Sequence, residues 1–445
     1  MSVTEVAADV VQATTGVVRD AVRTGVLAGL RARGHSTGRL LDPYMVVDPY
    51  PTYDWIRAQG PAFQAEMGIV TASHDVCGAV LRSPSVITAT SVRDTHMDGT
   101  SPLMRWLFGN PDRSGLIDPL GPDTMVGTDG ADHARLRSVV SAVFTPNAVS
   151  ALRPRLEEIA AELVDETARQ QTFDLMTSLA GPLPVRAICE VLGVPTRDVD
   201  RFARWGSDIA ADLDSLVPAH RQRAATRSLR DLKAYFEELV PARHRTPGDD
   251  ILSRLITAEA QEGRLSEREI VATAILLLFA GFETTVNLIG NGAAALLRHP
   301  EQLRLLQEDP TRIPRAVEEM LRYDAPVQLV GRIPTTDLCL ASADLPEGVM
   351  ISLMIGGANR DPAVFEDPGR FDVLRPNAAK HLSFAAGPHH CLGASLARME
   401  AQIAFTALLE RFEHLELAGT PRRRKTFILR GYRSIPVRGS APARR

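Results

Sequence analysis

The sequence predicts a mainly α-helical protein with small β-sheets, and three observations support this fold class. A capping-box pattern at 266–269 starts a helix that can run to His299. At 1.5 Å per residue, such a helix is roughly 50 Å long, enough to cross a whole domain. Further helical patterns extend from Pro146 to about residue 260, whereas the strand-like stretches, 62–72 and 326–334, are short.

The composition is that of an ordinary globular protein. Hydrophobic residues make up 44% of the 445 residues and charged residues 23%. The formal net charge is -4 and the isoelectric point is near 6.3. These values argue against a general nucleic-acid-binding surface.

The four cysteines are scattered along the chain, which fits a reducing, cytoplasmic compartment. Cys77, Cys189, Cys339 and Cys391 form neither a paired disulfide framework nor the clustered spacing of a zinc site. We find no signal peptide and no apolar run long enough to span a bilayer, so we expect no transmembrane anchor.

The chain divides into an N-terminal extension (1–40), one main body (41–438) and a flexible tail (439–445). Apolar residues of the extension fall loosely on one helical face. A membrane-surface helix is one interpretation, but a helix docked on the protein or a partly frayed tail is favoured. Residues 84–129 are irregular and rich in Gly, Pro, Ser and Thr, which is typical of a lid or binding loop.

One short loop carries the strongest chemical signal. Phe384, Gly387, Cys391 and Gly393 follow the spacing Phe, any two, Gly, any three, Cys, any one, Gly. Glycines let the backbone wrap closely around a bulky ligand, and a helix starting near Leu392 would favour a thiolate at its N-terminus. A thiolate on haem iron favours cleavage of a bound O–O bond. The alternative is that Cys391 is a small buried hydrophobe.

The long helix contains polar groups that a buried helix does not need. Glu283 is an ionisable residue in an apolar helix, which costs free energy unless it is paired or hydrated. Thr284 can donate a hydrogen bond to the carbonyl of Ala280 and bend the helix. Together with Gly281, this pattern makes room for a diatomic ligand and water, whereas the rest of the segment is expected to be a plain buried helix.

Two charged pairs are spaced for contact on helices. His133 and Arg137 are four residues apart, so they share a face, which is either a solvated basic face or a clamp for carboxylates. Glu319 and Arg322 are three apart and can form an ion pair, which at a surface contributes little.

Taken together, these motifs resemble those of the cytochrome P-450 monooxygenases, in the family's order, over about residues 45–437. Ala385 departs from the glycine common at that place in the family, and we expect a local change in backbone freedom without loss of a ligand. The resemblance implies a helical triangular prism with haem b between the long central helix and the cysteine loop. It also implies that residues 84–129 contribute the roof of a substrate pocket.

The resemblance also implies a role for each site residue. Cys391 is the iron ligand, in a loop whose Phe384, Gly387 and Gly393 bind the cofactor. On the central helix, Thr284 bonds iron-bound dioxygen, Glu283 relays protons, and Ala280 and Gly281 lie over the haem. Residues expected to bind the haem propionates are His133, Arg137, Arg332 and His389. His390 has no counterpart and is interpreted as structural. A buried structural network is expected from Glu319, Arg322 and Arg370.

The implied reaction inserts one oxygen atom from dioxygen into an apolar small molecule, such as a lipid, terpenoid or steroid-like compound. Candidate pocket residues are Leu276, Phe279, Gln328, Leu329, Val330 and Ile428, and a C-terminal hairpin at 429–436 is expected to touch substrate. Electrons would come from NAD(P)H through a separate ferredoxin reductase and ferredoxin. We expect an acidic ferredoxin to dock near Arg398 and Arg135.

Three alternatives remain. A haem-thiolate peroxygenase would use hydrogen peroxide directly, although such members usually lose the acid and alcohol that this chain keeps at 283 and 284. A haem sensor or carrier would need Cys391 but no proton relay. A cysteine hydrolase would use Cys391 with a histidine and bind no haem.

Overall fold

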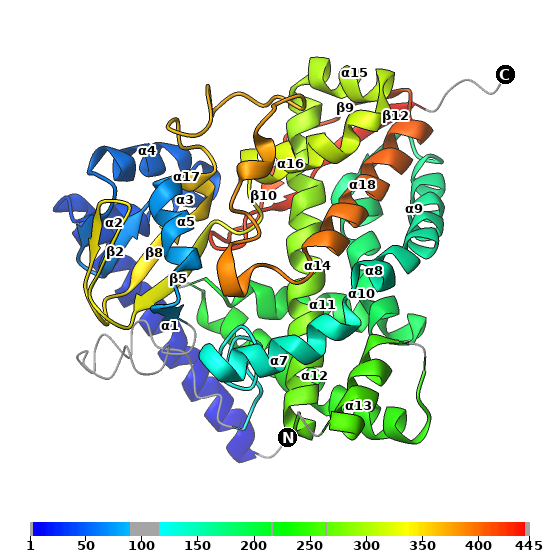
Figure 1. The fold of residues 1–445 in the computed structure, drawn as a ribbon, viewed down its shortest axis with the longest axis horizontal. Coiled ribbons are helices and arrows are strands. Elements are labelled where there is room, and N and C mark those ends of the chain that lie inside the picture. Colours follow the sequence, from blue (N-terminus) through cyan, green and yellow to red (C-terminus); the bar gives the residue numbers. More distant parts are fainter. Residues whose placement is uncertain (1–2, 90–114, 215–216, 249, 263–264, 441–445) are drawn as a thin grey trace.

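Helix α14 (Glu267–Arg298) runs through the centre of the molecule (Figure 1). The hydroxyl of Ser266 accepts the backbone N–H of Glu269, and the Glu269 carboxylate accepts the N–H of Ser266. The predicted capping box is therefore present, and the helix ends one residue before the predicted end at His299. The structure, a computed structural model, describes residues 3–89, 115–214, 217–248, 250–262 and 265–440.

Among the described residues, α14 is the one helix long and apolar enough to cross a membrane, which corrects the expectation that no such run exists. Its most apolar stretch is 78% buried inside the protein. Other helices cover it on several sides, so its composition is that of a core helix.

Helices make up most of the body around α14. The helices before residue 90 are α1 (Val3–Ala32), α2 (Ser36–Leu40), α3 (Tyr44–Val47), α4 (Tyr50–Ala58) and α5 (His74–Arg82), and all of them except α1 are short. Those before α14 are α7 (Gly130–Val143), α8 (Pro146–Ala151), α9 (Arg153–Thr167), α10 (Pro182–Val191), α11 (Val199–Ala211), α12 (Ala219–Arg245) and α13 (Ile251–Glu262). Those after it are α15 (Pro300–Glu308), α16 (Ile313–Tyr323), α17 (Ile355–Ala358) and α18 (Ala394–Arg411).

The strands are short, as predicted, and in the described part of the chain they form four small sheets. The largest has the order β1-β2-β8-β5-β3, with β1 (Phe63–Ala65), β2 (Gly68–Thr71), β8 (Ile351–Met354), β5 (Leu329–Pro334) and β3 (Val86–Thr88). The others pair β4 (Thr172–Asp174), β12 (Pro436–Ser440) and β9 (His414–Leu417); β6 (Leu338–Leu340) and β7 (Ala343–Leu345); and β10 (Arg422–Arg423) and β11 (Tyr432–Ser434). Figure 1 shows β2, β5 and β8 on one side of α14 and α9 on the other.

The apolar core follows this division. The main cluster joins α14 to α9, α10, α11 and α18, and a second cluster lies between the five-stranded sheet and α5. Burial of these faces is the main stabilising contribution, because the transfer of apolar area from water is the dominant favourable term in folding. The central helix is thereby held in a fixed position between the sheets and the helical side.

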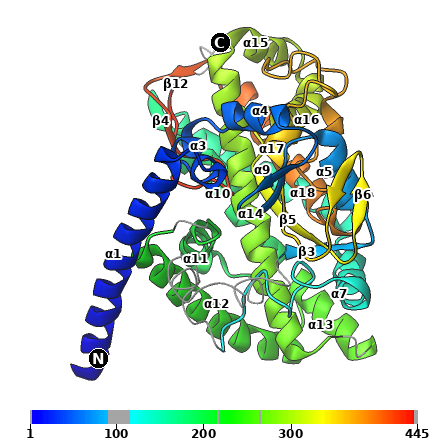
Figure 2. The same ribbon diagram turned by 90° about the vertical axis from the view of Figure 1, so that its left-hand side faces the viewer.

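The N-terminal extension is a helix that lies along the outside of the molecule (Figure 2). Asp20 accepts the backbone N–H of Ala219 at 2.9 Å, and Arg23 donates to the carbonyl of Val217 at 3.2 Å. The described part of α1 is thus docked at the start of α12, while Val17 and Val18 are exposed. Contact of this helix with a membrane stays a prediction.

Two predicted segments reach beyond the described residues. Of the predicted pocket roof at 84–129, residues 90–114 lie outside them. The predicted tail at 439–445 begins inside β12, which continues to Ser440.

Candidate active site

A cavity of about 550 Å³ lies between α14 and the cysteine loop, residues 384–393. This volume is in the usual range for small-molecule and cofactor sites. Leucine, isoleucine, valine and phenylalanine side chains dominate its walls, and a few polar groups interrupt them: Thr88, Arg137, Thr284, Thr285, Arg332, Ser383, His389, His390 and Cys391.

Cys391 is an exposed residue whose open side faces the cavity, and protein surrounds its other sides. Burial raises the pKa of the Cys391 thiol, while the backbone N–H of Gly393 and the guanidinium groups of Arg137 and Arg398 act in the opposite direction. The helix that follows, α18, begins at Ala394, two residues later than the predicted start near Leu392. A bound metal ion would deprotonate this thiol outright.

The backbone of the cysteine loop explains two of its small residues. Gly387 has φ = +68°, and a Cβ there would lie 2.4 Å from the carbonyl oxygen of Leu81, so glycine is required. Ala385 has φ = +55°, a left-handed conformation that glycine adopts more easily. The departure from glycine at this position therefore places an alanine in a strained backbone conformation. Gly393 has φ = -81° and needs no such freedom.

Aromatic and charged contacts hold the loop from behind. The backbone N–H of Cys391 donates to the carbonyl of Phe384 at 2.9 Å. The Arg398 guanidinium lies 4.4 Å from the Phe384 ring centroid and forms an ion pair with Glu318 at 2.7 Å. The loop is thus closed on itself and tied to α16 and α18.

The α14 wall of the cavity carries Ala280, Gly281 and Thr284. The Thr284 hydroxyl donates to the carbonyl of Ala280 at 3.1 Å, as its position in the helix predicts. A Cβ at Gly281 would lie 2.8 Å from the Ile188 side chain of α10, so the glycine lets these two helices pack closely.

Glu283 does not line the cavity. Its side chain is 2% exposed and forms an ion pair with Arg424, and Ser207 donates to it at 3.5 Å. The buried carboxylate is thereby compensated, which the sequence required. It faces away from the cavity surface on which the neighbouring Thr284 lies.

His133 and His389 stack with ring centroids 4.1 Å apart. The carboxylate of Asp129 contacts His389 Nε2 at 2.9 Å and also accepts the N–H of Thr88 at 2.9 Å. Burial, reinforced by the neighbouring His389 and Arg137 side chains, lowers the pKa of His133 to about 4. His133 is therefore neutral near pH 7, and its buried Nε2 has no protein partner in the described part of the chain.

Two arginines reach the cavity from different elements. Arg137 on α7 donates to the carbonyl of His390 at 2.7 Å, and Arg332 on β5 donates to the carbonyl of Gly331 at 2.8 Å. Burial lowers the pKa of Arg332, opposed by the negative charge of Asp129. His390, interpreted as structural, lines the cavity and supplies this carbonyl.

These residues fit the haem that the motifs predict. An apolar cavity, a thiol on one wall and donors from Arg137, Arg332 and His389 suit a flat apolar group with two carboxylates. The unpartnered Nε2 of His133 is the specific observation, because buried polar atoms in proteins almost always have a hydrogen-bond partner.

The predicted buried network is present with one wrong member. Arg322 donates to both oxygens of Glu319, at 2.6 and 2.8 Å, and both side chains are fully buried. The second arginine is Arg375, whose Nε lies 3.3 Å from Glu319. Arg370 was the wrong choice: its side chain is 62% exposed and points to Asp372, and only its backbone carbonyl accepts from Arg322 and Arg375.

Five of the six predicted pocket residues line the cavity, namely Leu276, Phe279, Leu329, Val330 and Ile428. Gln328, expected to face the pocket or flank it, does not line the cavity but lies between the lining residues Val327 and Leu329. Its amide is buried under the sheet, where it accepts from the Tyr53 hydroxyl at 2.8 Å and donates to the carbonyl of Ala325 at 2.6 Å. Gln328 lies just before β5, and these two hydrogen bonds turn its amide away from the cavity.

Sequence reasoning missed several residues that shape the site. Asp129 orients His389, and Arg424 pairs with Glu283. The C-terminal hairpin is formed by β10 and β11 and spans 422–434 rather than the predicted 429–436, and Asp214 accepts the backbone N–H groups of Phe427 and Ile428 in its connecting loop. Their partners are far away in the sequence, so no local spacing marks them.

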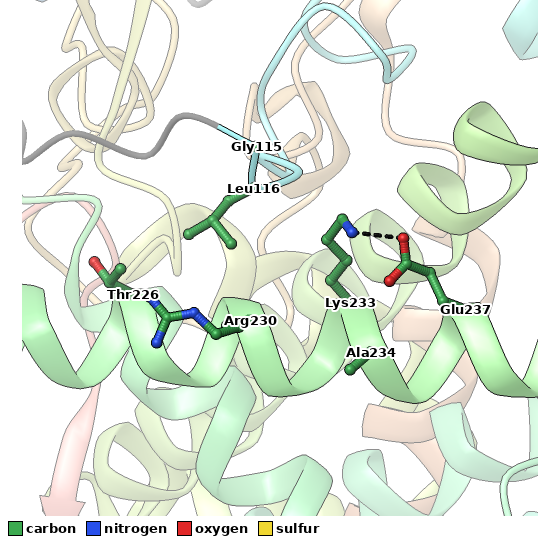
Figure 3. Close-up of a pocket in the computed structure, with 7 residues that line it drawn as sticks. All are labelled: Gly115, Leu116, Thr226, Arg230, Lys233, Ala234 and Glu237. Carbon is green, nitrogen blue, oxygen red and sulfur yellow. Dashed lines mark hydrogen bonds and ion pairs between the residues drawn. The ribbon is translucent and has the colours of Figure 1, made fainter. Parts of the chain in front are cut away.

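A second, smaller hollow of about 280 Å³ lies on α12 (Figure 3). It is lined by Gly115, Leu116, Thr226, Arg230, Lys233, Ala234 and Glu237, none of which was predicted to be a site residue. Lys233 is already paired with Glu237 at 2.5 Å, as Figure 3 shows, so we assign it no role.

Comparisons with known proteins agree with the motifs. The family model "Cytochrome P450" matches residues 116–431. The Mycobacterium tuberculosis protein designated cytochrome P450 140 is 38% identical over 422 residues, 93% of this chain and 95% of the relative. The 6-deoxyerythronolide B hydroxylase of Saccharopolyspora erythraea is 42% identical over 320 residues, 71% of this chain and 78% of the relative.

Solved structures show the same fold. The structure of P450BioI in complex with a hexadec-9Z-enoic acid ligated acyl carrier protein has a TM-score of 0.80 and 32% sequence identity, covering 90% of this chain and 100% of that chain. The resemblance in the motifs, the helical fold around α14 and the haem-thiolate enzyme class are thereby confirmed, and a cysteine hydrolase is ruled out. This chain belongs to the cytochrome P450 family of oxygen-incorporating oxidoreductases.

Proposed function

We propose that this enzyme inserts one oxygen atom from dioxygen into an apolar small molecule. The single observation that carries the proposal is the apolar cavity that has Cys391 in one wall and Thr284 of α14 in another. The enzyme would use haem b, and electrons from NAD(P)H would arrive through a separate ferredoxin reductase and ferredoxin.

The bound haem-thiolate group supplies the activation of dioxygen. Cys391 would hold it through the sulfur, and Arg137, Arg332 and His389, which line the cavity, would donate hydrogen bonds to its carboxylates. His133 does not line the cavity but stacks on His389, and its buried Nε2 is without a partner in the described part of the chain.

On α14, the Thr284 hydroxyl lies in the cavity wall, where it can exchange its bond to the Ala280 carbonyl for one to a ligand. Glu283, one residue earlier, is the proposed source of protons. Its ion pair with Arg424 holds the carboxylate away from the cavity wall that contains Thr284.

The substrate is expected to be apolar because leucines, valines and phenylalanines form most of the cavity walls. A lipid, terpenoid or steroid-like compound fits such walls. A relative named 6-deoxyerythronolide B hydroxylase and a structural neighbour bound to a fatty acyl carrier protein add polyketides and fatty acyl chains to the classes to be tested.

Docking of an acidic ferredoxin near Arg398 and Arg135 also remains a proposal. Both arginines are already in ion pairs, Arg398 with Glu318 at 2.7 Å and Arg135 with Glu269 at 2.7 Å. Their side chains are only partly exposed, so any steering contribution is smaller than that of free cations. A reduction rate that does not change with ionic strength would contradict this docking mode.

A peroxygenase reaction is the second candidate, and the retained Thr284 and Glu283 argue against it. The test compares turnover with dioxygen and redox partners against turnover with hydrogen peroxide alone, after a screen of fatty acids, terpenes, steroids and macrolactones for shifts of the haem absorption spectrum. We expect labelled oxygen from dioxygen in the product. Equal turnover with peroxide alone would support the peroxygenase instead.

Replacing Thr284 tests its role directly. Thr284→Ala should keep haem and substrate binding but release more hydrogen peroxide per electron pair, because the hydroxyl in the cavity wall is lost. Thr284→Ser is the matched control, since it keeps the hydroxyl and should keep the coupling of electrons to product. Unchanged coupling in Thr284→Ala would remove this residue from the mechanism.

A further inference from the structure

The exposed apolar side chains of this protein are concentrated on α1. In the described part of the chain, eight large apolar residues are exposed, and four of them belong to this one helix: Val17, Val18, Val22 and Val26. Val17 is 69% exposed and Val18 is 51% exposed. Single exposed apolar residues are ordinary, but a group of them on neighbouring turns marks a surface that contacts something else.

The orientation of α1 is the reverse of that of an ordinary surface helix. An amphipathic helix normally turns its apolar stripe toward the protein and its charged side chains toward water. Here Arg23 is buried, pairs with Asp20 at 3.1 Å and donates to the carbonyl of Val217, and Arg19 donates to Gln222 of α12. Several polar side chains thus dock the helix, while its valines face outward.

Helix α12 carries a row of arginines without partners. Residues 219–234 contain five cationic residues and one acidic residue, although the whole chain has a net charge of -4. Arg223, Arg227 and Arg230 are spaced by four and three, so they share one helical face. Among the residues that the structure describes, none of these three side chains has an ion-pair or hydrogen-bond partner. Lys233 is not part of this row, because it is paired with Glu237.

Such a row is unfavourable by itself. Like charges three or four residues apart destabilise a helix, and Arg227 and Arg230 are both exposed. Figure 3 shows Arg230 on the outer side of α12. An anionic partner would remove this repulsion, so the row favours a negatively charged surface as its ligand.

The valines and the arginine row lie next to each other. Asp20 of α1 accepts the backbone N–H of Ala219 at 2.9 Å, and a Cβ at Gly16 would lie 3.7 Å from the guanidinium of Arg223. The arginine row therefore begins where α1 rests on α12 and extends for roughly 10 Å, to Arg230. Figure 2 shows α1 along the outside of the molecule at this side.

We propose that the outer face of α1 and the arginine row of α12 together form a peripheral binding face for a membrane surface that contains anionic lipids. The valines would enter the boundary between head groups and acyl chains, and the arginines would pair with lipid phosphates. The buried helix α14 takes no part, so this is attachment to a surface without a spanning segment. The binding does not depend on the reaction proposed for the cavity.

Charge favours a lipid surface over two other partners. In a symmetric pair of chains the same patch of each copy meets, so a pairing through α1 would bring two unpaired arginine rows close together. An acidic protein would pair with the arginines but gain little from the valines. An anionic membrane satisfies both groups, because charged head groups lie directly above an apolar layer.

The test measures binding of the full-length, haem-loaded enzyme to vesicles by co-sedimentation. One set of vesicles consists of phosphatidylcholine alone, and the other contains equal parts of phosphatidylcholine and phosphatidylglycerol. We expect the wild type to bind the mixed vesicles at least about tenfold more tightly than the neutral ones, because each arginine near an anionic surface contributes roughly a fivefold gain. Added salt should weaken this binding.

Replacing two arginines tests the charged part of the face. Arg227→Gln combined with Arg230→Gln should weaken binding to the mixed vesicles by about twentyfold. The matched control is Arg153→Gln combined with Arg155→Gln, which removes the same charge from α9, where both arginines are already in ion pairs with neighbouring glutamates. This control should bind nearly as the wild type does.

Replacing two valines tests the apolar part. Val18→Gln combined with Val22→Gln should weaken binding to the mixed vesicles at least about tenfold, because the side chains that enter the lipid are lost. Both side chains point away from the docking contacts, so the variant should melt at the wild-type temperature. Leu374→Gln is the control, since it removes a side chain that is 37% exposed but lies outside α1.

Four results would overturn the inference. They are a wild type that stays in solution with the mixed vesicles, an arginine variant that binds no more weakly than its α9 control, a valine variant that binds as the wild type does, and a wild type that forms a dimer through these valines and ignores lipid. Oxygen insertion enters none of these measurements, so its failure would be seen separately.

Discussion

Removing the guanidinium group of Arg375 tests the buried network that holds the segment before the cysteine loop. Arg375 donates to the carbonyls of Glu366 at 2.6 Å, Asp367 at 3.1 Å and Arg370 at 3.0 Å, and its Nε lies 3.3 Å from Glu319. Arg375→Met keeps most of the aliphatic stem and removes all of these contacts at once.

The expected cost is about 3 kcal/mol of unfolding free energy, because each carbonyl left without its donor costs about 1–3 kcal/mol. Glu319 remains paired with Arg322, so the loss comes from the carbonyl acceptors and from part of the charge compensation. Arg370→Met is the control, because its side chain is 62% exposed and lies 3.7 Å from Asp372. An exposed pair of this kind contributes only about 0–1 kcal/mol.

Urea unfolding of the haem-loaded enzyme, followed by tryptophan fluorescence, measures both changes, and the ferrous carbonyl spectrum reports whether the thiolate stays on the iron. We expect Arg375→Met to unfold at much lower urea and to lose the thiolate spectrum earlier than the wild type. If Arg370→Met costs as much as Arg375→Met, or if Arg375→Met costs less than about 1 kcal/mol, the reasoning from buried contacts is refuted.

Two further changes test local physics. Burial raises the pKa of Asp214 to about 6, and the N–H groups of Ile428 and Phe427 act in the opposite direction. Between about pH 4 and pH 6 the folded protein therefore holds a proton on Asp214 that the unfolded chain releases, so the unfolding free energy falls as the pH rises through this range. Asp214→Asn should therefore gain thermal stability over the wild type at pH 8, by up to about 3 kcal/mol, but not at pH 4; an equal gain at both would contradict this. Ala385→Gly should stabilise the enzyme by about 0.5–1 kcal/mol, because relief of the left-handed alanine conformation exceeds the entropy cost of glycine. Ala386→Gly is the control and should destabilise the enzyme, because Ala386 has φ = -154° and is not strained. The melting temperatures of the two variants test this difference.

The parts of the fold that could be predicted are those with local chemistry. The capping box at Ser266 and Glu269 gave the start of α14 because both partners lie within one turn. Pro146, which fits the first position of a helix, likewise marked the start of α8. Gly387 could be singled out because a turn around a bulky ligand needs its conformational freedom.

Gln328 shows where this reasoning stops. It lies next to two residues that line the cavity, and its segment was predicted to be a strand leaving α16. Gln328 lies before the first residue of β5, and the direction of its amide is set by its bonds to the Tyr53 hydroxyl and the carbonyl of Ala325. A shift of one residue separates Gln328, bonded to Tyr53, from the lining residue Leu329.

The prediction of Arg370, rather than Arg375, as the second arginine of the buried network was wrong for another reason. Both arginines lie in an irregular segment without periodicity, so spacing could not decide which guanidinium turns inward. The structure shows that the outward residue still contributes, through its carbonyl, because an arginine with five donors needs several acceptors when it is buried. The same demand explains Arg424, which has a hairpin carbonyl as well as Glu283. Buried cations in this protein are therefore specified by sets of backbone carbonyls that only the folded chain brings together, and this is why the residues that hold the site in place were harder to predict than the residues that form it.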